Sequence, residues 1–160
     1  MTGSKAERLA LKKKWGDKVY NATKKKAKMM DDLFAKYKDG VANNTIYRGL
    51  NELDESVYNK FKNYKAGDSI EIDNAVTSWT QSKEALEQYS SGEYGIKFHL
   101  KGGRKLTKEL DIDKYSFYGK EELEVIVKDT RFKITKIKES THPQFIHQKR
   151  LDIYLKEIGP

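Results

Sequence analysis

Apolar residues recur every three or four positions between about Ala6 and Tyr37, the spacing of an amphipathic helix. Gly16 and the lysine run 24–26 are the two places where this helix is expected to divide. Gly40 is the expected end of the helical segment. The first quarter of the chain is therefore predicted to be helical.

From position 45 onward the pattern changes to short stretches typical of strands. The expected strands are residues 45–50, 75–80, 94–101, 121–127, 131–138 and about 149–156. Two short helices are expected between them, one that ends near Gly67 and one that Ser82 caps and that runs to Tyr89. A helical start followed mostly by strands indicates the α+β class.

The composition narrows the class of protein. The chain has 160 residues, the size of one domain, and 35% of them are charged. It contains no cysteine, which excludes disulfides and thiolate chemistry. No apolar run approaches the roughly 18 residues of a membrane span, and no signal peptide is visible. We therefore expect no membrane partner and a place in the cytoplasm of the producing or target cell. We also expect a monomer.

Positive charge is concentrated at the beginning of the chain. Residues 1–45 carry 12 lysines and arginines against five acidic residues, whereas the remainder is nearly neutral. We expect a basic helical segment, 1–45, and a core, 46–160, that form one compact domain together. A solvated helix face is the favoured explanation of the charge. Binding to nucleic acid or to an acidic protein is the alternative, but no nucleic-acid-reading signature accompanies it.

Several familiar sites can be excluded. Gly102-Gly103 lacks the further glycines and the helix of a dinucleotide fingerprint, and no GxxxxGK[ST] phosphate loop is present. His99, His142 and His147 lack the spacing and the companion ligands of a metal site, so no metal is expected. No nucleophile-elbow sequence marks a catalytic triad.

Two glutamates lie two positions apart in the predicted strand 121–127. Alternation places Glu122 and Glu124 on one face, roughly 6–7 Å apart, with Val125 and Val127 on the other. Like charges at this distance repel each other. The pair therefore either faces water on an ordinary half-buried strand or serves a chemical function.

Two further motifs precede this pair on the predicted strands. They are Tyr47-Arg48-Gly49 and Ser78-Trp79-Thr80. Ser78 follows Arg48 by 30 residues, and Glu124 follows Ser78 by 46. Singly, each motif fits an ordinary surface arginine or strand hydroxyl. In this order and spacing, the chain from about Ile46 to Leu155 resembles the Arg-Ser-Glu class of mono-ADP-ribosyltransferases.

The resemblance implies an α+β fold of the ADP-ribosyltransferase type. In this fold two packed antiparallel or mixed β-sheets follow N-terminal helices, and NAD binds in the central cleft between the sheets. The implied reaction is the transfer of ADP-ribose from NAD, as co-substrate, to an arginine side chain of a target protein, with release of nicotinamide. Toxins, phage proteins and effectors contain compact enzymes of this class.

The resemblance also implies roles for individual residues. Glu124 would stabilise the positively charged ribosyl group, and Ser78 would hydrogen-bond Glu124 and orient it. Arg48 would hold the NAD phosphates, because a guanidinium forks onto two oxygens. Gly49 would let the backbone approach the ligand closely. Thr80 would support the nucleotide pocket from the same face as Ser78.

The acceptor is implied by the first glutamate of the pair. Glu122 looks like the arginine-modifying version of this position, since a carboxylate can pair with a guanidinium. Relatives often place an aromatic residue three positions before it, where this chain has glycine, so Phe117 or Tyr118 is expected to read the target. Trp79 is expected in the core or against nicotinamide. His99 lies near where some toxin relatives carry a second arginine.

Two other functions remain open at this point. An NAD glycohydrolase on the same fold would use water as acceptor. A non-catalytic binding module would instead dock residues 1–45 on nucleic acid or on an acidic partner.

Overall fold

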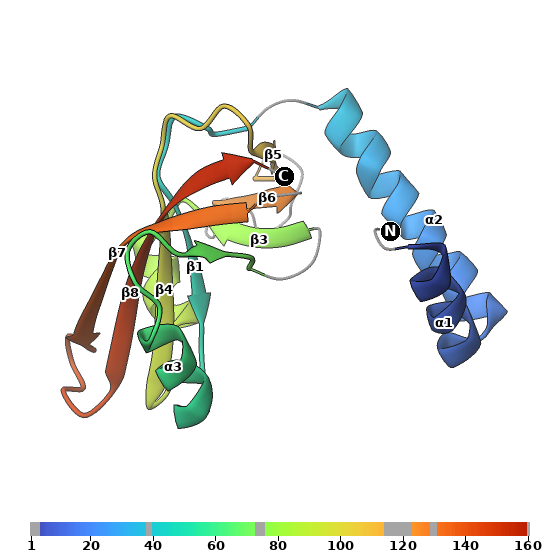
Figure 1. Ribbon diagram of the computed structural model, residues 1–160. Helices are drawn as coiled ribbons and strands as arrows, with labels where there is room; N and C mark the ends of the chain where they lie inside the picture. Colours follow the sequence, from blue (N-terminus) through green and yellow to red (C-terminus); the bar gives the residue numbers. More distant parts are fainter. Residues whose placement is uncertain (1–3, 38–39, 73–75, 114–122, 129–130, 160) are drawn as a thin grey trace. The chain divides into compact units, whose positions relative to one another are not determined.

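The computed structural model of the protein describes residues 4–37, 40–72, 76–113, 123–128 and 131–159 (Figure 1). Contacts group the chain into two units, Met1–Lys38 and Asp39–Pro160. The expectation that residues 1–45 and 46–160 form one domain together stays a prediction. No helix in the described part of the chain is long and apolar enough to cross a membrane.

The described part of the first unit consists of two helices. They are α1 (Lys5–Trp15) and α2 (Asp17–Lys36). A capping box starts α1: the Ser4 hydroxyl accepts from the Glu7 backbone N–H, and the Glu7 carboxylate accepts from the Ser4 N–H. Gly16, at φ +79°, separates the helices as predicted, because glycine adopts this conformation readily. The lysine run 24–26 was wrongly expected as a second break; lysine is a good helix former, and α2 continues through it.

The described part of the second unit contains eight strands and two short helices. The strands are β1 (Ile46–Leu50), β2 (Ser69–Ile70), β3 (Val76–Thr80), β4 (Tyr94–Leu100), β5 (Lys108–Asp111), β6 (Glu124–Lys128), β7 (Arg131–Thr141) and β8 (Lys149–Gly159). The helices are α3 (Glu55–Lys62) and α4 (Lys83–Tyr89). Ser82 caps α4 as predicted, since its hydroxyl accepts from the Ala85 N–H. The α+β prediction is confirmed.

The strands form one mixed sheet in the order β2-β7-β8-β4-β1-β3-β6-β5 (Figure 1). Neighbouring strands are antiparallel, except for β4 and β8, which run parallel. The two sheets expected from the sequence are the two halves of this sheet, β2-β7-β8-β4-β1 and β3-β6-β5. Among the described residues, one pair joins the halves: Tyr47 of β1 lies opposite Thr80 of β3.

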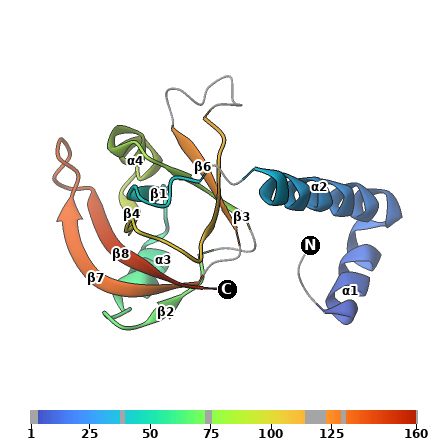
Figure 2. The same cartoon turned by 90° about the horizontal axis from the view of Figure 1, so that it is seen from above.

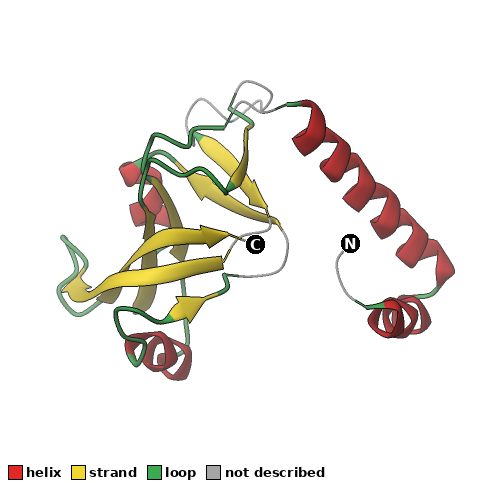
Figure 3. Ribbon diagram, turned by 45° about the horizontal axis from the view of Figure 1, so that its top comes forward, coloured by secondary structure: helices red, strands yellow, loops and turns green. Residues whose placement is uncertain are grey.

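The two halves of the sheet lie against each other (Figure 3). Buried apolar side chains from both halves form one core cluster. Trp79 of β3 meets Phe132 of β7 edge to face, with ring centroids 5.7 Å apart, and both side chains are buried. On the same side, Phe61 of α3 packs on Phe98 of β4. The α4 helix lies on the other face, so that β1 and β4 lie between α3 and α4 (Figure 2).

Several features of the sheet differ from the sequence expectation. β7 and β8 run about three residues further than expected, to Thr141 and Gly159. β2 and β5 were not predicted, because two and four residues are too few to show alternation. The strand expected at 121–127 begins only at Glu124, because Leu123 has φ +48°, outside the extended region. The alternation that placed Glu122 beside Glu124 is therefore interrupted at Leu123. Glu122 itself lies outside the described residues.

A buried ion pair closes the end of the sheet where β1 begins. Arg104 Nε and Glu109 Oε1 are 2.5 Å apart, and the two side chains are 2% and 1% exposed. The guanidinium also donates to the backbone carbonyls of Val41, Asn44, Leu100 and Lys101. Glu109 accepts from the Val41 N–H. Residues 41–44, which lead into β1, are thereby tied to the end of β4 by groups that must be satisfied because they are buried.

Glu109→Ala should destabilise the fold strongly, because it leaves the Arg104 charge buried without its ionic partner. We expect the free energy of unfolding to fall by about 3–5 kcal/mol, measured by urea denaturation. Glu139→Ala is the matched control, since the Lys62–Glu139 pair is 45% and 57% exposed. Its loss should cost less than about 1 kcal/mol. Equal losses in the two variants would contradict a supporting role for the buried pair.

Candidate active site

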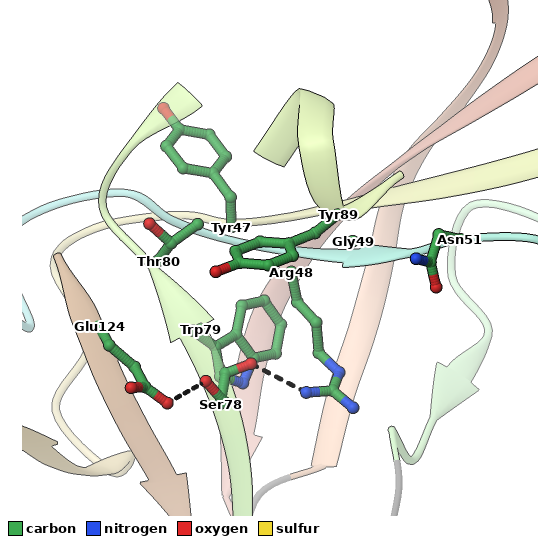
Figure 4. A pocket seen from close by; sticks show the side chains of 9 residues that line it. All are labelled: Tyr47, Arg48, Gly49, Asn51, Ser78, Trp79, Thr80, Tyr89 and Glu124. Atoms are coloured by element: carbon green, nitrogen blue, oxygen red, sulfur yellow. Dashed lines mark hydrogen bonds between the residues drawn. The ribbon is translucent and has the colours of Figure 1, made fainter. Parts of the chain in front are cut away.

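A pocket of about 190 Å³, which we name the front pocket, opens where β1, β3 and β6 meet the end of α4 (Figure 4). Its walls come from Tyr47, Arg48, Gly49, Asn51, Ser78, Trp79, Thr80, Tyr89 and Glu124. The described members of all three sequence motifs therefore line one pocket. Segments that are 30 and 46 residues apart in the chain meet there.

The register of β3 and β6 brings Ser78 and Glu124 together. Glu124 lies opposite Thr80, and Ser78 lies opposite Ile126. Because residues two apart on a strand share a face, Ser78 and Glu124 are diagonal neighbours on one side of the sheet. The Ser78 hydroxyl donates to Glu124 Oε1 over 2.5 Å (Figure 4). This hydrogen bond holds the carboxylate in one orientation.

Arg48 reaches the same serine from the other half of the sheet. Its Nη1 donates to the Ser78 backbone carbonyl over 2.8 Å (Figure 4). Ser78 therefore contacts the guanidinium through its carbonyl and the Glu124 carboxylate through its hydroxyl. The front pocket thus contains a group that can bind an anion and a group that can stabilise a developing cation, both at fixed positions.

Trp79 alternates with Ser78 and points to the opposite side of β3. It is buried among the core residues, and its indole N–H donates to the Thr77 hydroxyl over 2.7 Å. The expectation that Trp79 packs in the core is confirmed, although the residue also forms part of the wall of the front pocket.

Gly49 allows α4 to pack directly on β1. A Cβ atom at position 49 would lie 2.5 Å from the backbone carbonyl of Tyr89, the last residue of α4, so any larger residue would push the helix away. The Tyr89 ring consequently stands over the front pocket (Figure 4). Sequence reasoning gave Gly49 a role toward the ligand and missed Tyr89, since the contact between them depends on tertiary packing.

Thr80 is buried, and its hydroxyl accepts a hydrogen bond from the Ser82 backbone N–H over 2.9 Å. This bond shapes the turn that leads into α4. Thr80 thus supports the front pocket by fixing the start of the helix whose end carries Tyr89. Asn51, exposed at the end of β1, is a further lining residue that no sequence motif singled out.

The predicted target-reading residues are not among those the structure describes. Glu122, Phe117 and Tyr118 lie outside the described residues. His99, which the resemblance placed near a second arginine of some toxin relatives, does not line the front pocket. Its Nε2 lies 2.7 Å from Asp152 Oδ1, in a cavity on the other face of β4.

No cluster of histidine, aspartate and glutamate suited to a metal ion occurs in the described ranges. The polar groups of the front pocket are a serine hydroxyl, a glutamate and an arginine, a set suited to a ligand that carries both phosphate and hydroxyl groups.

Neither a protein-family model nor a curated protein matches the chain. Several solved structures do. Plx2a, an ADP-ribosyltransferase toxin from Paenibacillus larvae, is 17% identical, with a TM-score of 0.61 over 91% of this chain and 74% of its own. The ADP-ribosyltransferase Vis in complex with agmatine is 19% identical, with a TM-score of 0.62 over 92% and 62%. The enzymatic component C2-I of the C2 toxin from Clostridium botulinum is 17% identical, with a TM-score of 0.60 over 95% and 38%.

The chain spans less than two thirds of the length of Vis and of C2-I. At these identities the likeness is one of fold. It confirms the architecture that the order of the three motifs implied. The chain has the fold of these ADP-ribosyltransferases, and the described residues of its three motifs meet in the front pocket of that fold.

Proposed function

We propose that this chain is a mono-ADP-ribosyltransferase that transfers ADP-ribose from NAD to an arginine side chain of a target protein and releases nicotinamide. The observation that carries the proposal is the convergence of Arg48, Ser78 and Glu124, from three strands, on one pocket. The fold shared with ADP-ribosyltransferase toxins supports it. No step of the proposed reaction calls for a metal.

The reaction breaks the bond between ribose C1′ and the nicotinamide nitrogen. Nicotinamide is cationic within NAD and leaves as a neutral molecule with the bonding electron pair, so it needs no general acid. Positive charge develops on the ribose as this bond lengthens, a demand that glycosidases meet with carboxylates. Glu124 supplies a fixed carboxylate where that charge would develop.

Glu124 has two carboxylate oxygens and two tasks. Oε1 accepts from the Ser78 hydroxyl, and Oε2 can accept from the ribose 2′-hydroxyl in a charge-assisted hydrogen bond. Ser78 is a positioning residue in this scheme, because it acts on the carboxylate and not on the substrate. A small hydroxyl side chain is required at position 78, since it must fit between Glu124 and Arg48.

Arg48 is proposed to hold the NAD phosphates. A guanidinium presents its N–H donors in a planar fork that matches two phosphate oxygens. Gly49, next to it, keeps the backbone open to the ligand. Tyr89 presents the face of its ring toward the same pocket, and such a face attracts a cationic ring like that of nicotinamide.

The size of the front pocket fits one end of the dinucleotide. At about 190 Å³ it is smaller than the roughly 300–1,000 Å³ of pockets that bury a whole ligand. We infer that it encloses the nicotinamide ribose beside Glu124, while the rest of NAD extends past Arg48 along the open side.

Glu122 supports an arginine side chain as the acceptor. An arginine Nη would attack ribose C1′, form the new C–N bond and lose a proton, which the Glu122 carboxylate can accept. Phe117 or Tyr118 would contact the target protein. Crystals of Vis contain agmatine, a guanidine compound, and this supports an arginine-like acceptor for the shared fold.

Glu124→Gln should remove most of the turnover, because the amide keeps the shape but lacks the charge. We expect nicotinamide release from labelled NAD to slow about 10²–10³-fold. Ser78→Ala should slow it about 10–100-fold with KM for NAD little changed, since only the orientation of the carboxylate is lost. Parental turnover in Glu124→Gln would refute the assignment.

Arg48→Lys should weaken NAD binding more than chemistry, because lysine keeps the charge but loses the fork. KM for NAD should rise about tenfold or more, the value of one or two charged hydrogen bonds, and kcat should change less. Steady-state kinetics over a range of NAD concentrations separates the two constants. A fall confined to kcat would contradict a role in phosphate binding.

Glu122→Gln should separate transfer from hydrolysis. With agmatine as acceptor we expect ADP-ribose transfer to fall about 10²-fold, whereas NAD hydrolysis without acceptor should stay close to the parental rate. Unchanged transfer in the variant would show that Glu122 does not act on the acceptor.

The parent protein in the same assay tests the rival functions. If NAD is hydrolysed and neither agmatine nor an arginine-containing protein becomes ADP-ribosylated, the protein is a glycohydrolase. No nicotinamide release, together with nucleic-acid binding that weakens steeply with salt, would instead establish a binding module.

A further inference from the structure

A second cavity lies on the other face of β4, and we name it the rear groove. It measures about 450 Å³. The residues that matter for its chemistry are Lys83, Glu87, Lys97, His99, Lys101 and Tyr154. They come from α4, β4, the residue after β4, and β8. The reaction proposed above uses none of them.

One wall of the rear groove is a connected polar and aromatic cluster. His99 Nε2 lies 2.7 Å from Asp152 Oδ1, and the Ser140 hydroxyl donates to Asp152 Oδ2 over 2.8 Å. Burial alone would raise the pKa of Asp152, but the hydrogen bonds from His99 and Ser140 outweigh it and the pKa is lowered. His99 stacks on Tyr154 with centroids 4.5 Å apart, and Tyr47 meets His99 edge-on. The wall is thus built without any ligand.

Two lysines give the rear groove a positive character. Lys83, the first residue of α4, and Lys101, directly after β4, are exposed and line it. In the described part of the chain, neither has an acidic side chain within ion-pairing distance. Lys97 differs, because its Nζ lies 2.6 Å from Glu87 Oε1. Lys83 and Lys101 are therefore the two ammonium groups that can take up an anion.

The second oxygen of Glu87 indicates a donor on the ligand. Glu87 Oε2 is buried and has no hydrogen-bond partner within the described residues. Buried acceptors are almost always satisfied in native proteins. Oε2 is closed to solvent in this conformation, so a ligand donor reaches it once the Glu87 side chain turns toward the groove. A ligand of the rear groove should thus carry an anionic group and a hydroxyl or amine donor together.

We propose that the rear groove binds a ribose phosphate group, with the phosphate on Lys83 and Lys101 and a ribose hydroxyl donating to Glu87 Oε2. Carboxylates bind ribose hydroxyls in dinucleotide sites, and lysine binds phosphate as a point charge. The volume of the groove falls in the range of small-molecule pockets. A free nucleotide and the 5′ end of an RNA chain both present this group.

Tyr47 lines both cavities, but the rear groove shares no other lining residue with the front pocket, and the proposal does not depend on the reaction proposed above. Arg48 and Tyr47 are consecutive on β1 and point to opposite sides (Figure 4). Arg48 therefore cannot serve the rear groove. Lys83 and Lys101 do not line the front pocket.

The test is a titration of AMP into ¹⁵N-labelled full-length protein, followed by backbone amide shifts. NMR reports the two cavities separately, so AMP bound at the front pocket does not obscure the result. We expect saturable shifts in residues 97–101 and 152–154. The double variant Lys83→Glu/Lys101→Glu should weaken this binding at least tenfold, and Arg48→Ala should change it less than about twofold.

Lys60→Glu/Lys65→Glu is the matched control, because both lysines are exposed and lie on or after α3, on the other face of β4. It changes net charge equally and should leave AMP binding unaltered. Equal weakening in this control would show non-specific attraction and overturn the proposal. Shifts confined to the front pocket, or no saturation at millimolar AMP, would overturn it as well.

The ribose contact has its own test. The parent should bind AMP at least fivefold more tightly than 2′,3′-dideoxy-AMP, and Glu87→Gln should reduce that preference. Equal affinity of the parent for both ligands would overturn the role of Glu87. A 5′-phosphorylated oligoribonucleotide then distinguishes the two ligands that carry a ribose phosphate group. If it competes with AMP for the rear groove, the ligand is an RNA end. If it does not compete, the ligand is a free nucleotide.

Discussion

The pairing of Tyr47 with Thr80 is the constraint on which the rest of the site depends, because it joins the two halves of the sheet. Arg48 follows Tyr47 directly, Ser78 precedes Thr80 by two positions, and Glu124 lies opposite Thr80. A shift of one residue at this junction would turn the following side chains to the other face. The guanidinium and the carboxylate would then no longer share a pocket. The chemistry of the front pocket is therefore a consequence of register.

Close packing holds β1 in that register at both ends. Near its end, Gly49 lets the carbonyl of Tyr89 approach to a distance that any side chain would forbid. Before its start, Gly102 allows equally close contact with the backbone of Asn43, next to the carbonyls that Arg104 binds. Because protein interiors are packed without spare volume, such contacts leave the strand no alternative position. Precision in the placement of Arg48 thus comes from residues outside the pocket.

Two kinds of feature could be predicted from the sequence. They are helix boundaries, which depend on neighbouring residues, and site residues whose chemistry few residue types can supply. Gly16 and Ser82 marked helix ends through backbone rules, and the motifs around Arg48 and Ser78 could be found because few residues can replace a guanidinium or a small hydroxyl. Tertiary features left no such signal. The parallel pairing of β4 with β8 joins distant segments, and Tyr89 enters the pocket only through its contact with β1. The positive φ of Leu123 could not be predicted from the sequence, because leucine rarely adopts this conformation.

β1 contributes side chains to the cavities on both faces of its half of the sheet, because successive side chains of a strand point to opposite faces. Successive side chains alternate, so Arg48 points into the front pocket while Tyr47 contacts His99 in the wall of the rear groove. The helix α4 repeats this division, with Glu87 on the rear groove and Tyr89 at the front pocket. Any movement of α4 against β1 must alter both cavities, because Gly49 leaves no gap between them. The two cavities therefore share one rigid support.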